Sequence, residues 1–310
     1  MNILKFFNRF PDEESCKKEF LQYRLNEGVI CKKCKGKDHW WLPSKEQFKC
    51  CSCHFRTTLK SGTVMENTKL PFQYWFIAFH LLTATKKSFS ALEVQRQLGH
   101  KRYEPVWLLL HKIRIVMGKR DRKYKLGGIA EIDEGFFESV PPKERRNFFK
   151  NEEQKRGRGS QKQTKVLVAA ESKPIPKAEQ IKHKPARKVG YLKMEVMVEL
   201  NSAEINYEVK QMMKSDTKVL TDGWKGYAKL KEVIANHQVK VVDDPAQASK
   251  IFPWVHTAIG NAKKIFQGIH HSVGSDYMQN YLNEFCYKFN RRYLRGDLFE
   301  RLLIASVSNG

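Results

Sequence analysis

Two Cys-x-x-Cys pairs constrain the fold of this chain more tightly than any other feature of its sequence. Cys31 and Cys34 form the first pair, and Cys50 and Cys53 form the second after fifteen intervening residues. Two residues between the thiols let both sulfurs reach one ion, and four thiolates at this spacing are typical of a structural zinc ribbon. The flanking segments KKCKGK and KEQFKCC are too hydrophilic to surround a cluster of core cysteines. We therefore expect these four residues to bind Zn²⁺.

The remaining three of the seven cysteines lie outside this pattern. Cys51 sits inside the second pair at a spacing that does not suit a ligand, and Cys16 and Cys286 are expected to be ordinary buried thiols. The N-terminus has no apolar core of signal-peptide length, and no segment approaches the ~18 uninterrupted apolar residues of a membrane span. We expect a soluble cytoplasmic protein without membrane contact, whose reduced thiols bind metal rather than form disulfides.

The most pronounced global property of the chain is its positive charge. Its 310 residues include 57 Lys and Arg against 33 Asp and Glu, which gives a net charge of +24 and a pI near 9.7. Clustered basic residues in such excess favour a polyanionic partner such as nucleic acid. The hydrophobic content of 41% is enough for a real core and excludes a disordered chain.

Residues 69–125 are expected to form a helical, helix-turn-helix-like segment that binds DNA. An apolar helix over 71–84 precedes a second helix, which opens with a capping box at Ser90. Gly99 ends that helix, and Pro105 suits the first turn of a third helix that continues into basic residues. Two short helices around a glycine-containing turn are typical of a helix-turn-helix, although small helical bundles have the same pattern.

From about residue 127 the pattern changes to strands. The expected elements, in chain order, are strands at 129–138, 164–172 and 190–200, a helix at 202–214, a strand at 218–227 followed by a helix, a strand at 238–244 and a helix that begins near Pro253. This is the order of a ribonuclease-H-like α/β domain with a mixed sheet.

The chain is therefore expected to have three parts. Residues 1–68 hold an N-terminal helix and the zinc ribbon, residues 69–125 the helical segment, and residues 126–310 the ribonuclease-H-like domain. A basic insert at 139–163 interrupts the last part. From its start to Lys165, nine Lys or Arg stand against three Glu, a composition that suits a DNA backbone or simply a solvated loop.

The segment GGIAEIDEGFFESV, residues 127–140, places acids inside an apolar strand. Side chains alternate along a strand, so Glu131 and Asp133 share one face while Ile132 and Glu134 share the other. Carboxylates are rarely buried without a partner. Glu131 is interpreted either as support for a metal or, more simply, as a salt-bridged structural acid.

Two further residues are expected to meet Asp133. Asp222 ends the fourth strand, which is adjacent to the first strand in this topology, and His256 lies in the first turn of the helix over the carboxyl ends of both. Carboxylate oxygens suit Mg²⁺ or Mn²⁺, which complete their shells with water and phosphate oxygens. A pair of such ions can catalyse an in-line displacement at phosphorus.

With these residues in view, the sequence resembles the bacterial insertion-sequence transposases that carry an N-terminal zinc ribbon and an ISXO-like DDE domain. The resemblance covers nearly the full chain. It is carried by the cysteine pairs and by the segments GTVMENTKLPFQYWFIA, EIDEGFF, RGRGSQKQTKVLVAAE, TDGWKGY, WVHTAIGNAKKIFQGIHH and YLNEFCYKFNRR. It implies a ribonuclease-H-like nuclease fold, metal-dependent strand cleavage at the ends of the element, and strand transfer into target DNA.

The resemblance also assigns roles to single residues. In this group the third metal ligand varies among Glu, Asn and His and is followed seven residues on by Lys; His256 and Lys263 stand at those places. Asp133, Asp222 and His256 would then bind the catalytic Mg²⁺ or Mn²⁺, and Lys263 would contact phosphate. Imidazole is more at home with Mn²⁺ than with Mg²⁺. A histidine simply packed against Trp254 is the alternative.

Other candidates for the third position remain open. Asn261 lies more than one helical turn beyond His256. Glu284 is the carboxylate alternative and is kept as a second-rank catalytic residue, although Glu284 and Lys288 at i, i+4 could be a helix ion pair. Among the remaining polar residues, four could contact DNA or serve only the local structure: His270, His271, Arg291 and Arg292.

The leading hypothesis is thus a transposase that binds the ends of an insertion sequence and target DNA. The alternative is a non-catalytic, sequence-specific DNA-binding regulator derived from one. The intact Asp133 and Asp222 favour the enzyme. Because two element ends must be handled together, the mechanism implies a homo-oligomer on DNA. The expected location is the bacterial cytoplasm, in association with the nucleoid.

Overall fold

The computed structural model describes most of the chain: residues 1–142, 160, 162–182, 186–241, 251–294 and 296–308. Two compact units are present. The first comprises Met1–Arg120 together with the residues from Arg291 onward, and the second comprises Asp121–Asn290. Most of the basic insert expected at 139–163 lies outside the described residues.

The first unit contains a small antiparallel sheet that carries the two cysteine pairs. Its strands are β1 (His39–Leu42), β2 (Gln47–Cys50) and β3 (Arg56–Thr58), in the order β1-β2-β3. Phe48 of β2 is buried, and its ring lies 4.7 Å from that of Trp41 on β1. So few side chains make a minimal core, and sheets of this size commonly need a metal or another cross-link for stability.

The rest of the first unit is helical. Its helices are α1 (Ile3–Arg9), α2 (Glu13–Glu27), α3 (Phe72–Ala84), α4 (Ala91–Leu98), α5 (Tyr103–Arg122), which runs on into the second unit, and α11 (Leu298–Ser308). The Ser90 hydroxyl caps α4 by accepting the N–H of Glu93 at 3.1 Å. Gly99 ends α4 at φ 61°, a left-handed conformation that favours glycine.

The sequence-based division placed the C-terminal residues in the ribonuclease-H-like domain, but in the structure the residues from Arg291 onward belong to the first unit. Helix α11 contacts α2 and α3 of the first unit. Its buried residues Phe299, Leu302 and Leu303 need an apolar partner, and Phe299 finds one in the aromatic cluster around Phe76. Arg9 of α1 also pairs with Glu300 at 2.6 Å.

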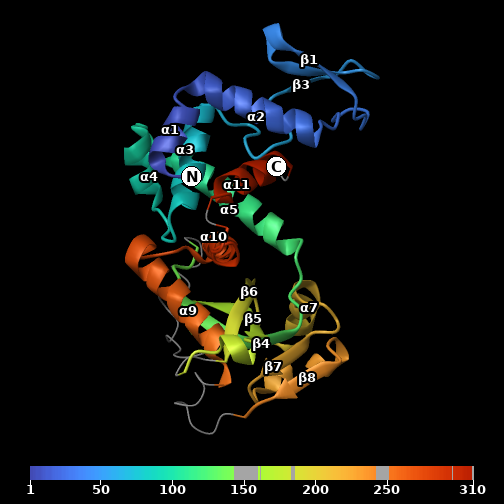
Figure 1. Ribbon diagram of the computed structural model, residues 1–310, viewed down its shortest axis with the longest axis vertical. Coiled ribbons are helices and arrows are strands. Elements are labelled where there is room, and N and C mark those ends of the chain that lie inside the picture. Colours follow the sequence, from blue (N-terminus) through green and yellow to red (C-terminus); the bar gives the residue numbers. More distant parts are fainter. Residues whose placement is uncertain (143–159, 161, 183–185, 242–250, 295, 309–310) are drawn as a thin grey trace. The chain divides into compact units, whose positions relative to one another are not determined.

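The second unit is built on a five-stranded mixed sheet (Figure 1). The strands are β4 (Ile129–Glu138), β5 (Gln163–Pro174), β6 (Arg187–Met197), β7 (Lys218–Thr221) and β8 (Asn236–Val239), in the order β6-β5-β4-β7-β8. Strands β4, β5 and β6 pair antiparallel, while β7 is parallel to both β4 and β8. The expected ribonuclease-H-like α/β fold is confirmed.

Helices cover the two faces of this sheet (Figure 1). On one face, α9 (Pro253–Ile265) and α10 (Met278–Asn290) pack on the even-numbered residues of β5 and on Phe137 of β4. On the other face, α7 (Ser202–Met212) packs on Ala130 and Ile132. Strand alternation therefore directs Glu131 and Asp133 towards α9, as their spacing predicts.

Two local expectations were wrong. The segment after Asp222 forms two 3₁₀ turns, Lys225–Tyr227 and Leu230–Glu232, rather than an α-helix. Gly226 favours this outcome because glycine is a poor helix former. A Cβ at this position would also collide with the Trp224 ring, so the observed turn requires glycine. The last strand begins at Asn236, earlier than expected, and residues 242–250 lie outside the described part.

Across the described ranges, no helix has both the length and the apolar character that a membrane span requires.

Candidate functional site

The four expected zinc ligands come together in the first unit. Within the described part of the chain, they are the one group of three or more metal-ligating side chains whose donor atoms all lie within 4.8 Å of one another. The Sγ atoms of Cys31 and Cys53 are 3.5 Å apart, as are those of Cys34 and Cys50. Four sulfurs at ~2.3 Å from one Zn²⁺ would be about 3.8 Å apart, so this cluster fits a metal ion such as zinc.

The two knuckles have the same backbone structure, which explains why their spacing is equal. The N–H of Lys35 donates to the carbonyl of Cys31 at 3.0 Å, and the N–H of His54 donates to that of Cys50 at 3.1 Å. Lys35 and His54 both have φ near +60°, so each knuckle closes with a left-handed residue. Backbone N–H groups directed at the sulfurs lower the pKa of Cys31, to about 6, and that of Cys50. This favours the thiolate form at these two positions. At Cys34 the Gly36 N–H acts in the same direction, but hydrogen bonds with the sulfurs of Cys53 and Cys50 raise the pKa to about 12.

The other cysteines behave as the sequence predicts. Cys51 lies outside the four-sulfur cluster. Cys16 and Cys286 are buried, and burial raises the pKa of both thiols, that of Cys16 to about 12. Both are therefore unreactive core residues.

In the second unit, Asp133 and His256 face each other. Asp133 lies in the middle of β4 with its side chain 22% exposed, and its Oδ1 accepts the N–H of Glu134 at 2.9 Å. His256 is the fourth residue of α9, and its Nδ1 lies 3.5 Å from Asp133 Oδ2. Two donors bound to one ion at ~2.1 Å would be separated by about 3 Å when adjacent in an octahedral shell, so this pair fits a shared metal.

Asp222 lies at the end of the neighbouring strand. Parallel pairing of β4 and β7 places Glu131 opposite Leu220, so this register, continued for two residues, sets Asp133 of β4 opposite Asp222, just past the end of β7. Asp222 Oδ1 accepts the N–H of Trp224 at 3.0 Å, which fixes the carboxylate in a turn. In the described residues, Asp222 does not join Asp133 and His256 in a three-donor cluster within 4.8 Å.

The charges of both aspartates affect the pKa of the nearby Tyr227 hydroxyl. This side chain is 1% exposed. Its pKa is raised well above the usual value by burial first, and further by the negative charges of Glu134, Asp133 and Asp222. One hydroxyl thus lies within Coulombic reach of both carboxylates, an arrangement of acids that a cation would relieve.

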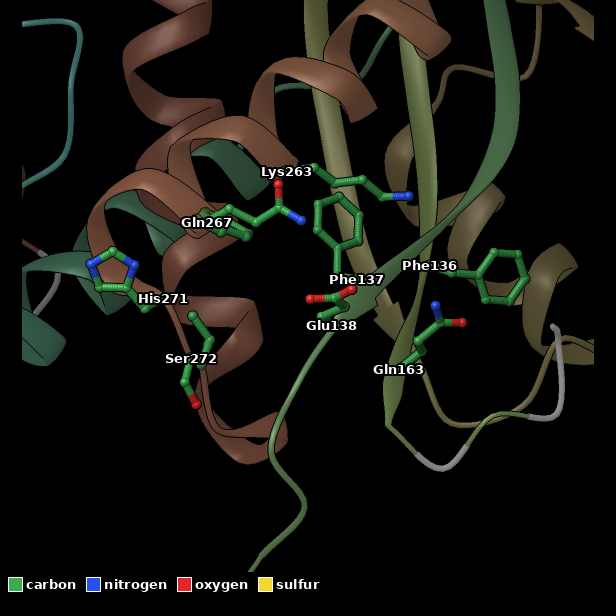
Figure 2. Close-up of a pocket in the computed structure, with 10 residues that line it drawn as sticks. Phe136, Phe137, Glu138, Gln163, Lys263, Gln267, His271 and Ser272 are labelled. Atoms are coloured by element: carbon green, nitrogen blue, oxygen red, sulfur yellow. The ribbon is translucent and has the colours of Figure 1, made fainter. Parts of the chain in front are cut away.

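Lys263 extends the same face along α9. Its ammonium lies 5.8 Å from the centre of the Phe137 ring, which stands on the same side of β4 as Asp133. Figure 2 shows Lys263 and Gln267 beside Phe137 and Glu138, at a cavity of about 100 Å³ that His271 and Ser272 also line. The helix therefore carries an imidazole beside Asp133 and, two turns later, a cation beside this cavity.

The other candidates for the third position are placed elsewhere. Glu284 belongs to α10, which packs along β6, two strands away from β4. Its carboxylate pairs with Lys288 at 2.9 Å, and the two side chains are 3% and 9% exposed. The pair is thus a buried ion pair within one helix. Asn261 is exposed on α9.

The remaining polar candidates take part in local structure. The ring of His270 packs on Tyr281 with the centroids 4.6 Å apart. The N–H of His271 donates to the carbonyl of Phe266 at 2.9 Å and so ends the π-helical turn Phe266–His270. Arg292 lies over the ring of Tyr293 at 4.5 Å. Contact of these residues with DNA stays a prediction.

Glu131 has a partner that sequence reasoning did not foresee. Its Oε2 accepts the N–H of Trp254 at 2.9 Å and the N–H of Val255 at 3.3 Å, in the first turn of α9. The sequence did indicate that this helix needs a capping group from elsewhere in the chain. The residue before Pro253 is Phe252, which has no side-chain oxygen to cap the helix.

Comparison with known proteins identifies the family. Residues 125–290 match the family described as the ISXO2-like transposase domain. The match covers more than half of the chain and includes β4, β7, α9 and α10. The chain belongs to this transposase family. Since transposases act on DNA, the match places the protein among DNA-processing enzymes.

Among solved structures, the transposase is similar to "Crystal structure of the Mos1 Strand Transfer Complex". The identity is 14%, the alignment covers 79% of this chain and 81% of that chain, and the TM-score is 0.30. This TM-score is too low to equate the two folds, so the assignment rests on the family match and the sheet topology. No curated protein matches the transposase significantly.

Proposed function

We propose that this protein is the transposase of an insertion sequence, which binds the ends of its element and catalyses metal-dependent strand cleavage and strand transfer. One observation carries the proposal: Asp133 and His256 lie 3.5 Å apart, from different elements of a domain that matches a transposase family. A half-exposed imidazole beside a strand carboxylate provides two of the donors that a divalent-cation site needs.

In this proposal Asp133, Asp222 and His256 hold the catalytic Mg²⁺ or Mn²⁺. Bound ions supply Lewis-acid chemistry for an in-line displacement at phosphorus, and two of them lie ~3.5–4 Å apart in sites of this kind. Asp133 faces His256 and stands on the strand next to that of Asp222, so it would serve both ions, whereas Asp222 and His256 would each complete one shell. Three donors spread over two ions need not fall within 4.8 Å of one another, and phosphate oxygens and water complete such shells.

Lys263 would contact a phosphate of the bound strand. Its position two turns after His256 directs a positive charge to the same face of β4. The protein's main contribution to rate would be to position the strand and stabilise charge.

DNA binding is proposed to involve the first unit and the overall charge. The Cys₄ ribbon would hold Zn²⁺ as a structural ion, and the helical segment α3–α5 would bind the element ends. A net charge of +24 would supply the salt-dependent attraction to the phosphate backbone. Two ends must be joined in one reaction, so a homo-oligomer on DNA in the bacterial cytoplasm, associated with the nucleoid, completes the proposal.

The proposal is tested by excision from a supercoiled plasmid that carries this reading frame with its natural flanking DNA, in Mg²⁺ and in Mn²⁺. Imperfect inverted repeats bordered by short direct duplications in that DNA would supply the ends. We expect metal-dependent double-ended cleavage and joining by the wild-type protein. Binding of the ends without cleavage in either metal would instead support a non-catalytic regulator.

The third metal ligand can be tested in the same assay. His256→Ala is expected to lower cleavage by at least about 100-fold because it removes a metal donor. His256→Glu is expected to retain cleavage and to shift the preference from Mn²⁺ towards Mg²⁺, since a carboxylate is a harder ligand than imidazole.

Glu284→Gln is the matched control for this test. It removes the charge that faces Lys288, and we expect the free energy of unfolding to fall by up to about 3–5 kcal/mol. Cleavage by the folded fraction should be unchanged. The assignment of His256 is wrong if folded Glu284→Gln protein is inactive while His256→Ala protein remains active.

A further inference from the structure

Helix α9 begins without a cap of its own. The first N–H groups of any helix lack intrahelical partners and carry the positive end of the helix dipole. At α9 the preceding residue is Phe252 and the first is Pro253, so neither provides a side-chain acceptor. The N–H groups of Trp254 and Val255 are satisfied instead by the carboxylate of Glu131, which lies 123 and 124 residues earlier in the chain.

The surroundings of Glu131 hold its carboxylate in one place. The side chain is 1% exposed. Burial raises its pKa, while the hydrogen bonds from Trp254 and Val255, the Ser172 hydroxyl and the charge of Arg187 oppose that rise. Arg187 Nε in turn donates to Ser172 Oγ at 2.7 Å. Glu131 is therefore anchored from β5 and β6 on one side and joined to α9 on the other.

This cap sets the spacing of the candidate active site. Glu131 and Asp133 are two residues apart on one face of β4, about 7 Å along the strand. Trp254 and His256 are two residues apart in the first turn of α9. Fixing the Trp254 N–H on Glu131 consequently fixes His256 over Asp133, at the observed 3.5 Å.

We infer that Glu131 is a positioning residue: by capping α9 it holds the His256 imidazole against Asp133. The inference rests on the proposed function, in which both of these residues bind the catalytic metal. Within the described residues, the Glu131 carboxylate bonds to the backbone of Trp254 and Val255, whereas the His256 ring contacts Asp133. Glu131 acts through the helix.

Glu171 provides a matched control in the same sheet. It too is a buried carboxylate, 5% exposed, and it accepts two backbone N–H groups, those of Gly127 and Tyr191, each at 3.0 Å. It lies on β5 and contacts no part of α9 through these bonds. Glu171→Gln and Glu131→Gln thus remove equal charge and weaken equal numbers of backbone hydrogen bonds, but only one of them loosens α9.

The first experiment measures amide hydrogen exchange in the full-length protein at residues 254–256. Replacing a charged acceptor by a neutral one weakens each bond, and Glu131→Gln is expected to speed exchange of the Trp254 and Val255 amides by about tenfold. Glu171→Gln should leave these amides unchanged. This readout does not depend on catalysis. Equal exchange in both variants would overturn the inference.

The second experiment measures the Mn²⁺ concentration that gives half-maximal cleavage. We expect Glu131→Gln to raise this concentration about tenfold without weakening binding of the DNA ends, and Glu131→Ala to raise it further. Glu171→Gln should behave as wild type at equal folded concentration. A Glu131→Gln protein with wild-type metal dependence would overturn the inference. If the wild-type protein itself does not cleave DNA, the proposed function fails, and the exchange comparison alone still decides whether Glu131 fixes α9.

Discussion

Asp133→Asn is expected to abolish Mg²⁺- or Mn²⁺-dependent cleavage while leaving binding of the element ends nearly intact. The substitution keeps the size of the side chain and removes the negative charge that would face both metal ions. A loss of at least about 10³-fold in the cleavage rate, corresponding to roughly 4 kcal/mol, is the expected size of the effect. The measurement is nicking and double-strand cleavage of a plasmid that carries both ends, together with a binding titration.

Asp216→Asn is the control for this substitution. Asp216 is exposed two residues before the start of β7, at the opposite end of that strand from Asp222, and its replacement removes the same charge. Cleavage should be unaffected. Equal cleavage by the Asp133→Asn and wild-type proteins would show that Asp133 is not a catalytic acid.

The second large effect concerns the cysteine cluster. Cys50→Ser removes one of four thiolates, and the affinity for Zn²⁺ should fall by far more than the 10–100-fold that follows the loss of an outer hydrogen-bond partner. Because the sheet β1–β3 has a minimal core, metal binding and folding of the ribbon are coupled. We expect the bound Zn²⁺, measured by elemental analysis, to fall from about one per chain to near zero. Amide exchange of residues 39–58 should become fast.

Cys51→Ser separates the loss of a ligand from the loss of a thiol. Its sulfur lies beside the cluster in sequence but outside it in space, so zinc content and amide exchange should match the wild type. Chelation of the wild-type protein should reproduce the Cys50→Ser result. Retention of one Zn²⁺ per chain by Cys50→Ser protein would rule out the four-cysteine site.

The sequence predicted features that depend on chain geometry over a few residues. The two-residue spacing of each cysteine pair led to the cluster, and the alternation of side chains in β4 led to the shared face of Glu131 and Asp133. The order of strands and helices was enough to predict the ribonuclease-H-like sheet. Gly99 and Ser90 ended and started α4 as expected, since capping acts within one turn.

Contacts between residues that lie far apart in the sequence were harder to predict. The cap at Glu131 could not be chosen over the alternatives, because several partners were chemically acceptable for its carboxylate. The sequence offered a metal role or a salt bridge for Glu131, and the structure placed it at a helix terminus instead. The packing of α11 with α2 and α3 was missed for a similar reason. An amphipathic helix shows that it needs a partner but does not identify that partner.

By itself, then, the sequence determined which side chains could bind metal and which face of each strand they occupy, because covalent spacing sets both. Only the tertiary structure decided that His256, rather than Glu284, is the candidate that faces Asp133, and that Glu131 caps the helix that carries His256. The physical reason is that a buried carboxylate must find hydrogen-bond donors wherever the fold brings them. Here those donors are backbone amides more than 120 residues away in the chain.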